Sequence, residues 1–201
     1  MTGEKPIPLA ELGEITAGPS GSLLEGLHDG PDGIPVVTPP SITSRHTVDT
    51  RKLRRVPVGD AEKLARFAVQ EGDILVVRQG SLGRLALIGA QHDLWFYGSS
   101  CVRIRPRPEL IFPAYLASYL SSSPAQAELV GQALRGTVPS LNSAMLRELV
   151  VIVPSMDRQL AIVDVLADID EEVRILHEMS DRLQALRPAI FAEMLKGVMP
   201  A

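Results

Sequence analysis

The sequence predicts an α+β fold, in which a β-rich domain with small helices is followed by a long C-terminal helix of the coiled-coil type. Two observations predict this class. The first half is rich in glycine and proline turns, such as residues 18–21 and 29–33, which separate short runs without a helical period. The last forty or so residues instead carry large apolar side chains at seven-residue spacing on a charged background. The 201 residues suit one compact domain with an appendage.

Short apolar runs between turn signals predict the strands of the first domain. They are Ile34–Val37, Ile74–Val77, residues 85–88, residues 101–105 and a last buried strand, Val150–Val153, which Pro154 closes. One helical passage is expected over residues 60–67, with Asp60 as its N-cap. Two more helices, residues 114–120 and 125–134, each follow a proline.

The C-terminal helix is expected to run from Ser155, as N-cap, to about Lys196. The chain therefore divides into residues 1–154, a β-rich domain, and residues 155–201, a long helix. The strict seven-residue stripe is Ile162, Ile169, Leu176, Leu183 and Ile190, and the alternate core positions are Leu166, Val173 and Met194. Ser180 and Arg187 interrupt the alternate positions, whereas a stripe through Met179 and Leu186 requires a three-residue phase shift after Leu176.

This helix either lies on its own domain or forms a coiled-coil arm. Forty residues span about 60 Å, longer than a small domain can cover, and the seam is narrow, so the arm is favoured. Pro188 is expected to kink or restart the helix.

The net charge of −4 conceals a strong asymmetry along the chain. Residues 44–107 hold twelve basic and six acidic side chains, a local charge of +6, whereas the rest holds eight basic and eighteen acidic ones. A local basic field, rather than the chain average, is what attracts phosphate. A basic β-domain with an acidic helix is also a common arrangement for solubility.

The sequence contains none of the motifs that carry catalysis. It lacks a Gly-x-Ser-x-Gly elbow, a phosphate loop ending in Gly-Lys-Ser/Thr and a His-Glu-x-x-His zinc motif. Residues 80–83 (GSLG) are interpreted as a tight β-turn, and Cys101 as an inert core residue. One cysteine and four scattered histidines predict neither a disulfide nor a metal site. We therefore expect a protein that is not an enzyme and needs no cofactor.

No signal peptide or membrane span is expected. The longest apolar runs are far shorter than the ~20 residues that a membrane helix needs. A reducing cytoplasm is the natural location for such a chain.

Several motifs stand in an order that carries more information than any one of them. They are residues 12–15 (LGEI), 72–84 (GDILVVRQGSLGR), 99–104 (SSCVRI), 113–116 (PAYL), 136–142 (GTVPSLN), 150–154 (VVIVP) and 159–162 (QLAI). This series resembles the specificity subunit of type I restriction–modification systems. The resemblance covers nearly the whole chain, with residues 1–154 as one DNA target-recognition domain and residues 155–201 as its following spacer or dimerisation helix.

The resemblance implies a non-catalytic, sequence-specific DNA-recognition subunit. In that family two recognition domains each read half of a bipartite DNA site, and two antiparallel helices hold them apart. Adenine methyltransferase subunits bind around them, and a translocating restriction subunit can join. Here only one domain and one helix are present, so the chain looks like half a subunit, either a natural half that forms a homodimer or a fragment. The seam residues named above, from Ile162 to Ile190, would then form the dimer or partner helix.

The candidate DNA contacts lie in the basic region. Arg78, Gln79, Ser81 and Arg84 surround a glycine turn, and Arg and Gln suit bidentate contacts with base edges. Thr137, beside Gly136, is a candidate phosphate contact. The other candidates form the basic segment Arg45, Arg51, Lys52, Arg54 and Arg55. If this segment is extended, Arg51 and Arg55 share one face and Lys52 and Arg54 the other. Each residue could instead be a solvated loop residue or the partner of a carboxylate.

Two alternatives remain open at this stage. One is a homodimeric protein-interaction module without a DNA function. The other is an orphan or decoy specificity subunit that competes for methyltransferase partners. The aromatic run Trp95, Phe96 and Tyr97 could stack on a base, but a core position is favoured.

Overall fold

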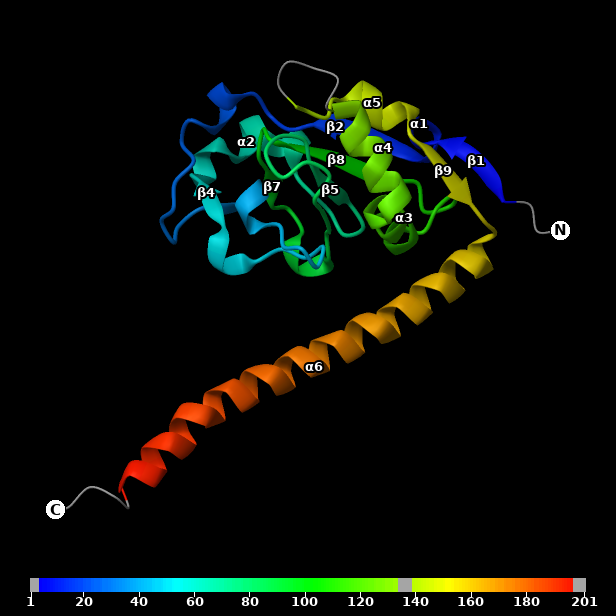
Figure 1. Ribbon diagram of the computed structural model, residues 1–201. Coiled ribbons are helices and arrows are strands. Elements are labelled where there is room, and N and C mark those ends of the chain that lie inside the picture. The colour runs from blue at the N-terminus through cyan, green and yellow to red at the C-terminus, as the bar shows by residue number, and fades with distance from the viewer. Residues whose placement is uncertain (1–3, 134–138, 197–201) are drawn as a thin grey trace. The chain divides into compact units, whose positions relative to one another are not determined.

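The computed structural model describes residues 4–133 and 139–196 and divides into two compact units, of which the first is Met1–Leu160. A four-stranded antiparallel sheet in the order β2-β8-β5-β6 lies at the centre of this first unit (Figure 1). Its strands are β2 (Gly13–Ala17), β8 (Cys101–Pro106), β5 (Ile74–Val77) and β6 (Leu85–Leu87). All four residues of β5 are buried, and the strand pairs with β8 on one side and with β6 on the other. The strands expected here are confirmed, with β6 one residue shorter and β8 one residue longer than the patterns predicted.

A second, three-stranded sheet has the order β4-β3-β7. It consists of β4 (Arg54–Val56), β3 (Ile34–Val37) and β7 (Phe96–Tyr97), with β7 parallel to β3. Val36, Phe96 and Tyr97 are buried and belong to one hydrophobic cluster with Leu75 and Val77 of the first sheet. The aromatic run therefore supplies core residues, as favoured from the sequence, and the side chains of Phe96 and Tyr97 cannot stack on a base.

The first and last strands of this unit, β1 (Lys5–Pro8) and β9 (Val150–Val153), pair antiparallel. The interpretation of residues 150–153 as a buried strand is only half right. Val151 is fully buried, but Val150 and Ile152 keep 42% and 37% of their surface exposed. Successive side chains of a strand point to opposite faces, and only one face of β9 is buried, so the side chains at alternate positions face solvent.

Small helices complete the first unit, and Figure 1 shows several of them grouped near β1 and β9. They are α1 (Leu9–Leu12), α2 (Ala61–Leu64), α3 (Pro113–Ser121), α4 (Ser123–Ala133) and α5 (Ser143–Glu148). The two helices expected after prolines correspond to α3 and α4, although position 134 lies outside the described residues. The expectation of one helical passage over residues 60–67 is wrong. It consists of α2 between two 3₁₀ turns, and the Asp60 carboxylate accepts from Lys63 at 3.1 Å instead of capping the helix.

Two arginines of β8 point into the first unit and are held there by acidic and carbonyl oxygens. Arg105 forms two 2.8 Å hydrogen bonds with the fully buried carboxylate of Asp73. Arg103, only 4% exposed, donates to the Ala68 carbonyl at 2.8 Å and to Glu14 at 3.1 Å. Part of the basic excess counted from the sequence is therefore neutralised inside the fold, because buried charges are paired.

The long helix α6 (Met156–Lys196) forms the second unit from Ala161 onward. It begins directly after Ser155, as expected, and the Ser155 carbonyl accepts the N–H groups of Arg158 and Gln159. The expected restart at Pro188 is wrong, because the helix continues through that residue to Lys196. A proline inside a helix removes one backbone hydrogen bond and strains the preceding turn, but it need not end the helix.

The border between the two compact units follows Leu160, within the second turn of α6, rather than residue 154. The division of function at residues 154 and 155 therefore stays a prediction. In the described residues, no helix combines the length and the hydropathy that crossing a bilayer requires.

Candidate nucleic-acid interface

The β5–β6 hairpin presents the glycine turn that the sequence predicted. The Val77 N–H donates to the Arg84 carbonyl at 2.8 Å, and the Gly83 N–H donates to the Val77 carbonyl at 3.1 Å. Gly80 and Gly83 have φ of 80° and 75°, the left-handed region that favours glycine. The turn between them leaves Gln79 and Ser81 exposed.

Gln126 of α4 forms a hydrogen bond with this hairpin. Its Nε2 donates to the Gly83 carbonyl at 3.0 Å and to the Leu120 carbonyl at 2.6 Å. A Cβ at position 83 would come within 2.3 Å of the Gln126 side-chain oxygen. The hairpin is therefore fixed both by its own glycines and by a side chain from a distant helix.

A second loop, residues 42–52, lies beside the hairpin. Ile42 and Val48 form an isolated antiparallel bridge, which closes a turn through His46 at φ 60°. The Arg84 Nη1 donates to the Ile42 carbonyl at 3.2 Å, and the Leu87 N–H donates to the His46 carbonyl at 3.2 Å. Two segments that lie about forty residues apart in the sequence are thereby joined.

We call six of the exposed polar and basic residues of these two loops the basic loop surface. It consists of the candidate DNA contacts Arg45, Arg51, Lys52, Gln79, Ser81 and Arg84.

One acidic residue, Asp49, lies among these basic side chains. Arg51 makes hydrogen bonds of 2.9 and 3.1 Å to its carboxylate, and the Lys52 Nζ lies 4.0 Å from it. The hydrogen bond with Arg51 lowers the pKa of Asp49 and raises the pKa of Arg51, so both stay charged at neutral pH. The two loops keep a net positive charge, because they carry four basic side chains against one carboxylate.

The other arginine candidates are more engaged with the protein. Arg54 donates to the Leu27 carbonyl at 2.8 Å and to Asp29 at 3.1 Å, and Arg55 donates to the Gly33 carbonyl at 3.2 Å. Arg78 is half-buried, and its Nε is buried without a hydrogen-bond partner. These three guanidinium groups have less freedom to reach a ligand than those of the basic loop surface.

The condition for alternating faces along residues 51–55, an extended chain, is not met over residues 50–52. Thr50–Lys52 is a 3₁₀ turn, which Asp49 caps by accepting from the Arg51 N–H, and the strand begins only at Arg54. Arg51 and Arg55 therefore do not lie on one face of a single strand. Thr137, the remaining candidate, lies outside the described residues.

The buried Cys101 has no visible role in binding. Burial raises the pKa of the Cys101 thiol to about 12, so it is protonated and unreactive at neutral pH. In the described part of the chain, no group of three or more His, Cys, Asp or Glu residues could hold a metal ion.

Sequence reasoning missed the residues that join and support the loops. His46 adopts a positive φ, which is uncommon for a residue other than glycine, and its neighbours gave no sign of it. Gln126 stands on a helix among small residues, and only the three-dimensional fold brings it to Gly83. Neither role had a local signal in the sequence.

The predicted seam residues all lie on α6 and keep substantial exposed surface. Ile162 and Leu166 are half-buried, whereas Ile169, Val173, Leu176, Leu183 and Ile190 are exposed. A row of large apolar side chains is thus left in contact with water along one helix.

Comparison with known proteins identifies the family. The family model for the type I restriction modification DNA specificity domain matches residues 3–185. The chain is 22% identical over 138 residues to the HindI type I restriction enzyme specificity subunit of Haemophilus influenzae, covering 67% of this chain and 30% of that protein. It is 27% identical over 158 residues to the EcoBI specificity subunit of Escherichia coli, covering 77% of this chain and 33% of that protein.

Solved structures show the same fold at low sequence identity. The HsdS subunit of Thermoanaerobacter tengcongensis aligns with a TM-score of 0.58 and 17% identity over 88% of this chain and 39% of that one. The S subunit of the M. genitalium type I restriction–modification system aligns with a TM-score of 0.63 and 18% identity, over 94% of this chain and 44% of that one. The chain spans about a third of the length of the HindI and EcoBI specificity subunits. It belongs to the type I restriction–modification DNA specificity family.

Proposed function

We propose that this chain is a DNA-recognition subunit that reads one half of a bipartite site and directs an adenine methyltransferase to it. Membership of the specificity family supports this role, as does the position of the basic loop surface on two adjoining loops. The chain itself would perform no chemistry, and the methyl transfer would belong to its partner.

The observation that carries the proposal is the hydrogen bond between Arg84 and the Ile42 carbonyl. It uses one of the five N–H donors of the guanidinium and orients the group, while the remaining donors stay available. An oriented arginine with free donors can make the bidentate contact with guanine O6 and N7 that is the commonest specific contact in the major groove. Gln79, on the same hairpin, has the amide that suits adenine.

The remaining basic side chains fit a different role. Arg45, Arg51 and Lys52 lie on the exposed 42–52 loop, where long flexible cations can reach backbone phosphates. Phosphate contacts fix the register of a protein on the duplex, and base contacts then choose the sequence. The two loops together would supply both kinds of contact from one surface.

The exposed apolar row on α6 fits the part of the proposal that concerns partners. One recognition domain reads only one half-site, so a bipartite target requires a second domain at a fixed distance. A homodimer joined through antiparallel α6 helices would supply it and would offer a docking surface for methyltransferase subunits. The target would then be an inverted repeat with a nonspecific spacer, and a restriction subunit could join the complex.

Mapping methylated adenines in cells that express the chain with a type I methyltransferase subunit tests this function. We expect methylation at one bipartite sequence, which is absent when either protein is omitted. Methylation at unchanged sites without this chain would exclude the role. If the purified chain binds no DNA at any salt concentration, a protein-interaction module becomes the better description.

A further inference from the structure

The apolar residues of α6 are arranged symmetrically about Leu176. Toward the N-terminus, large apolar side chains stand 3, 7, 10 and 14 residues away, at Val173, Ile169, Leu166 and Ile162. Toward the C-terminus they stand at the same 3, 7, 10 and 14 residues, at Met179, Leu183, Leu186 and Ile190. The seam therefore has the same spacing when it is traced in either direction.

We propose that this seam pairs with a second copy of itself, antiparallel, with a twofold axis at Leu176. The inference rests on the homodimer in the proposed function and specifies its register. In an antiparallel pair centred on Leu176, a residue a given number of positions before the centre lies level with the partner residue the same number after it. Ile162 then lies opposite the partner's Ile190, and Ile169 lies opposite the partner's Leu183.

The spacing also satisfies the rule for core layers in an antiparallel coiled coil. Before Leu176 the gaps between seam residues run 4, 3, 4, 3, and after it they run 3, 4, 3, 4. The change of phase exchanges the a and d positions at Leu176, so each layer joins an a residue of one helix to a d residue of the other. The phase shift, which overwinds a coiled coil locally, places the twofold axis on a seam residue, Leu176, rather than between two seam residues.

The exposure of the central residues gives the pairing its driving force. Leu176 keeps 62% of its surface exposed, and Met179 and Leu183 each keep 58%. Each such side chain represents apolar surface that burial in a dimer would remove from water. Because of the twofold symmetry, each seam residue would be buried at two equivalent positions in the dimer.

Charges beside the seam favour the antiparallel orientation. Residues 161–173 hold five acidic side chains and no basic one, whereas Arg182 and Arg187 follow in the second half. The proposed register brings Glu172 within two residues, about 3 Å along the axis, of the partner's Arg182 on the same side of the seam. A parallel pair would instead place the acidic stretches together and set Arg182 near the partner's Arg187, at the spacing of facing e and g positions.

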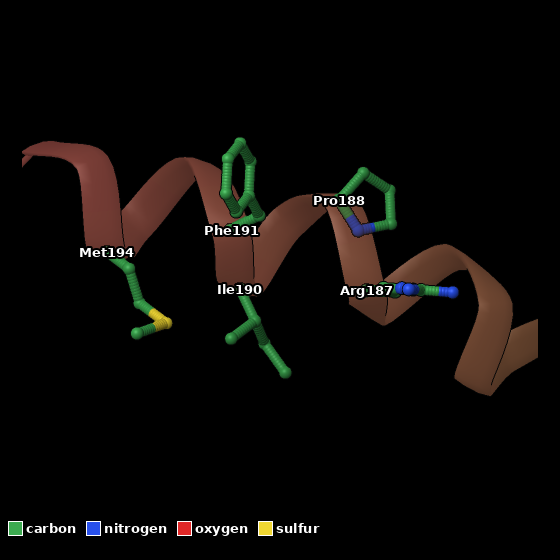
Figure 2. Close-up of a pocket in the computed structure, with 5 residues that line it drawn as sticks. All are labelled: Arg187, Pro188, Ile190, Phe191 and Met194. Atoms are coloured by element: carbon green, nitrogen blue, oxygen red, sulfur yellow. The ribbon is translucent and has the colours of Figure 1, made fainter.

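Those side chains are available for such contacts. Arg174 on the outer face holds Glu171 at 2.5 Å and also pairs with Glu178, and in the described helix neither Glu172 nor Arg182 takes part in an ion pair. Figure 2 shows that Ile190 and Met194 project from one side of α6 while Pro188 and Phe191 project from the other. The proline ring therefore does not obstruct the seam at Ile190.

Disulfide trapping of single-cysteine substitutions tests the register in the full chain. The native Cys101 is fully buried, so it can remain, and the unsubstituted chain is the control for it. We expect mild oxidation to link two copies of Leu176→Cys. Leu183→Cys alone should not link, because its two copies would lie about 21 Å apart along the axis. A mixture of Ile169→Cys and Leu183→Cys chains should give the linked heterodimer.

The same experiment distinguishes the other possible arrangements. Equal linking of Leu176→Cys and Leu183→Cys would indicate a parallel pair and overturn the proposal. A dimer by sedimentation with no Leu176→Cys product would mean a different register, and a monomer would remove the pairing altogether. Because DNA binding and site-directed methylation are measured separately on the unsubstituted chain, these failures are distinguishable from failure of the proposed function.

A charge exchange supplies an independent test that leaves the apolar seam intact. We expect Glu172→Arg to weaken dimerisation several-fold and the double variant Glu172→Arg with Arg182→Glu to restore it. Asp181→Arg, on the outer face of the helix, is the matched control and should leave the dimerisation constant unchanged. Weakening that the double variant does not relieve would overturn the predicted pair.

Discussion

The side-chain oxygen of Gln159 accepts a 2.7 Å hydrogen bond from the Phe112 N–H, and its amide nitrogen donates to the Pro154 carbonyl at 3.0 Å. Only 1% of Gln159 is exposed. One buried amide therefore fastens the beginning of α6 to the loop before α3. The glutamine of the QLAI motif has a structural role that its sequence position alone did not reveal.

We expect Gln159→Met to lower the free energy of unfolding of the chain by about 1–3 kcal/mol. Methionine has a similar length, but it leaves the Phe112 N–H and the Pro154 carbonyl buried without partners. Urea denaturation followed by circular dichroism measures the change. Gln91→Met, at an exposed position, is the matched control and should change stability by less than about 0.5 kcal/mol. Equal effects of the two substitutions would contradict this role for Gln159.

Glycine substitutions in the hairpin should differ in size and, for one control, in sign. Gly83→Ala combines a positive φ with the clash at Gln126, so we expect it to destabilise the fold more than Gly80→Ala, which has a positive φ and open space. Gly131→Ala, within α4 and free of nearby atoms, should stabilise by up to about 1 kcal/mol. Thermal unfolding of the three variants would reveal the order, and a Gly83→Ala variant as stable as Gly80→Ala would exclude the clamp by Gln126.

Substitutions on the basic loop surface should separate phosphate contacts from base contacts. Arg45→Ala should weaken binding to all DNA sequences alike and reduce the salt slope by about one unit. Arg84→Ala should weaken binding to the cognate half-site by about 1–3 kcal/mol and leave nonspecific binding less affected. Fluorescence anisotropy over a range of salt concentrations measures both.

Arg54→Ala is the control for these variants, because its guanidinium is bound to Leu27 and Asp29. It should alter stability more than DNA affinity. Loss of DNA binding in Arg54→Ala, together with normal binding in Arg45→Ala and Arg84→Ala, would indicate that the DNA-binding surface lies at β4 instead.

The protein should lose stability in alkaline solution. Burial raises the pKa of Cys101 from 9.0 to about 12 and that of Tyr97 from 10.0 to about 12. The unfolded chain therefore releases these protons first, so the stability they contribute is complete below pH 9 and is lost as the pH rises toward 12. At pH 10 the Cys101 effect alone amounts to about 1 kcal/mol.

Urea denaturation at pH 8, 9 and 10 measures this loss. Cys101→Ala should remove most of the slope between pH 9 and 10, while the effect of Tyr97 develops mainly above pH 10. Identical pH profiles for the variant and the unsubstituted chain would contradict the assignment to Cys101.

The strands that sequence patterns predicted best are short apolar runs bounded by turn signals. Residues 74–77 and 34–37 were predicted to the residue, because short apolar runs between turns have few other conformations. β1 contains two prolines and β7 only two residues, so neither produced a recognisable pattern. The pairing of such segments depends on distant partners, which a local pattern does not encode.

The candidate site also combines features that the sequence predicts with features that it does not. The glycine turn and its flanking polar residues follow from local rules, and the structure confirms the turn. Which arginines are free does not follow, because Arg54, Arg103 and Arg105 are held by groups 25 to 89 residues away in the chain. Charge counted along a sequence cannot distinguish a cation at the surface from one that neutralises a buried carboxylate.

The pairing of β1 with β9 brings the two ends of the β-rich domain next to each other. Lys5 and Val153 are register partners, so the chain enters and leaves the unit at neighbouring points on one small ribbon. A domain whose two ends meet can be inserted, duplicated or exchanged at that junction with little strain on its interior. The loops that carry Arg45 and Arg84 could therefore be replaced together, as one piece, while the connection to α6 stays the same.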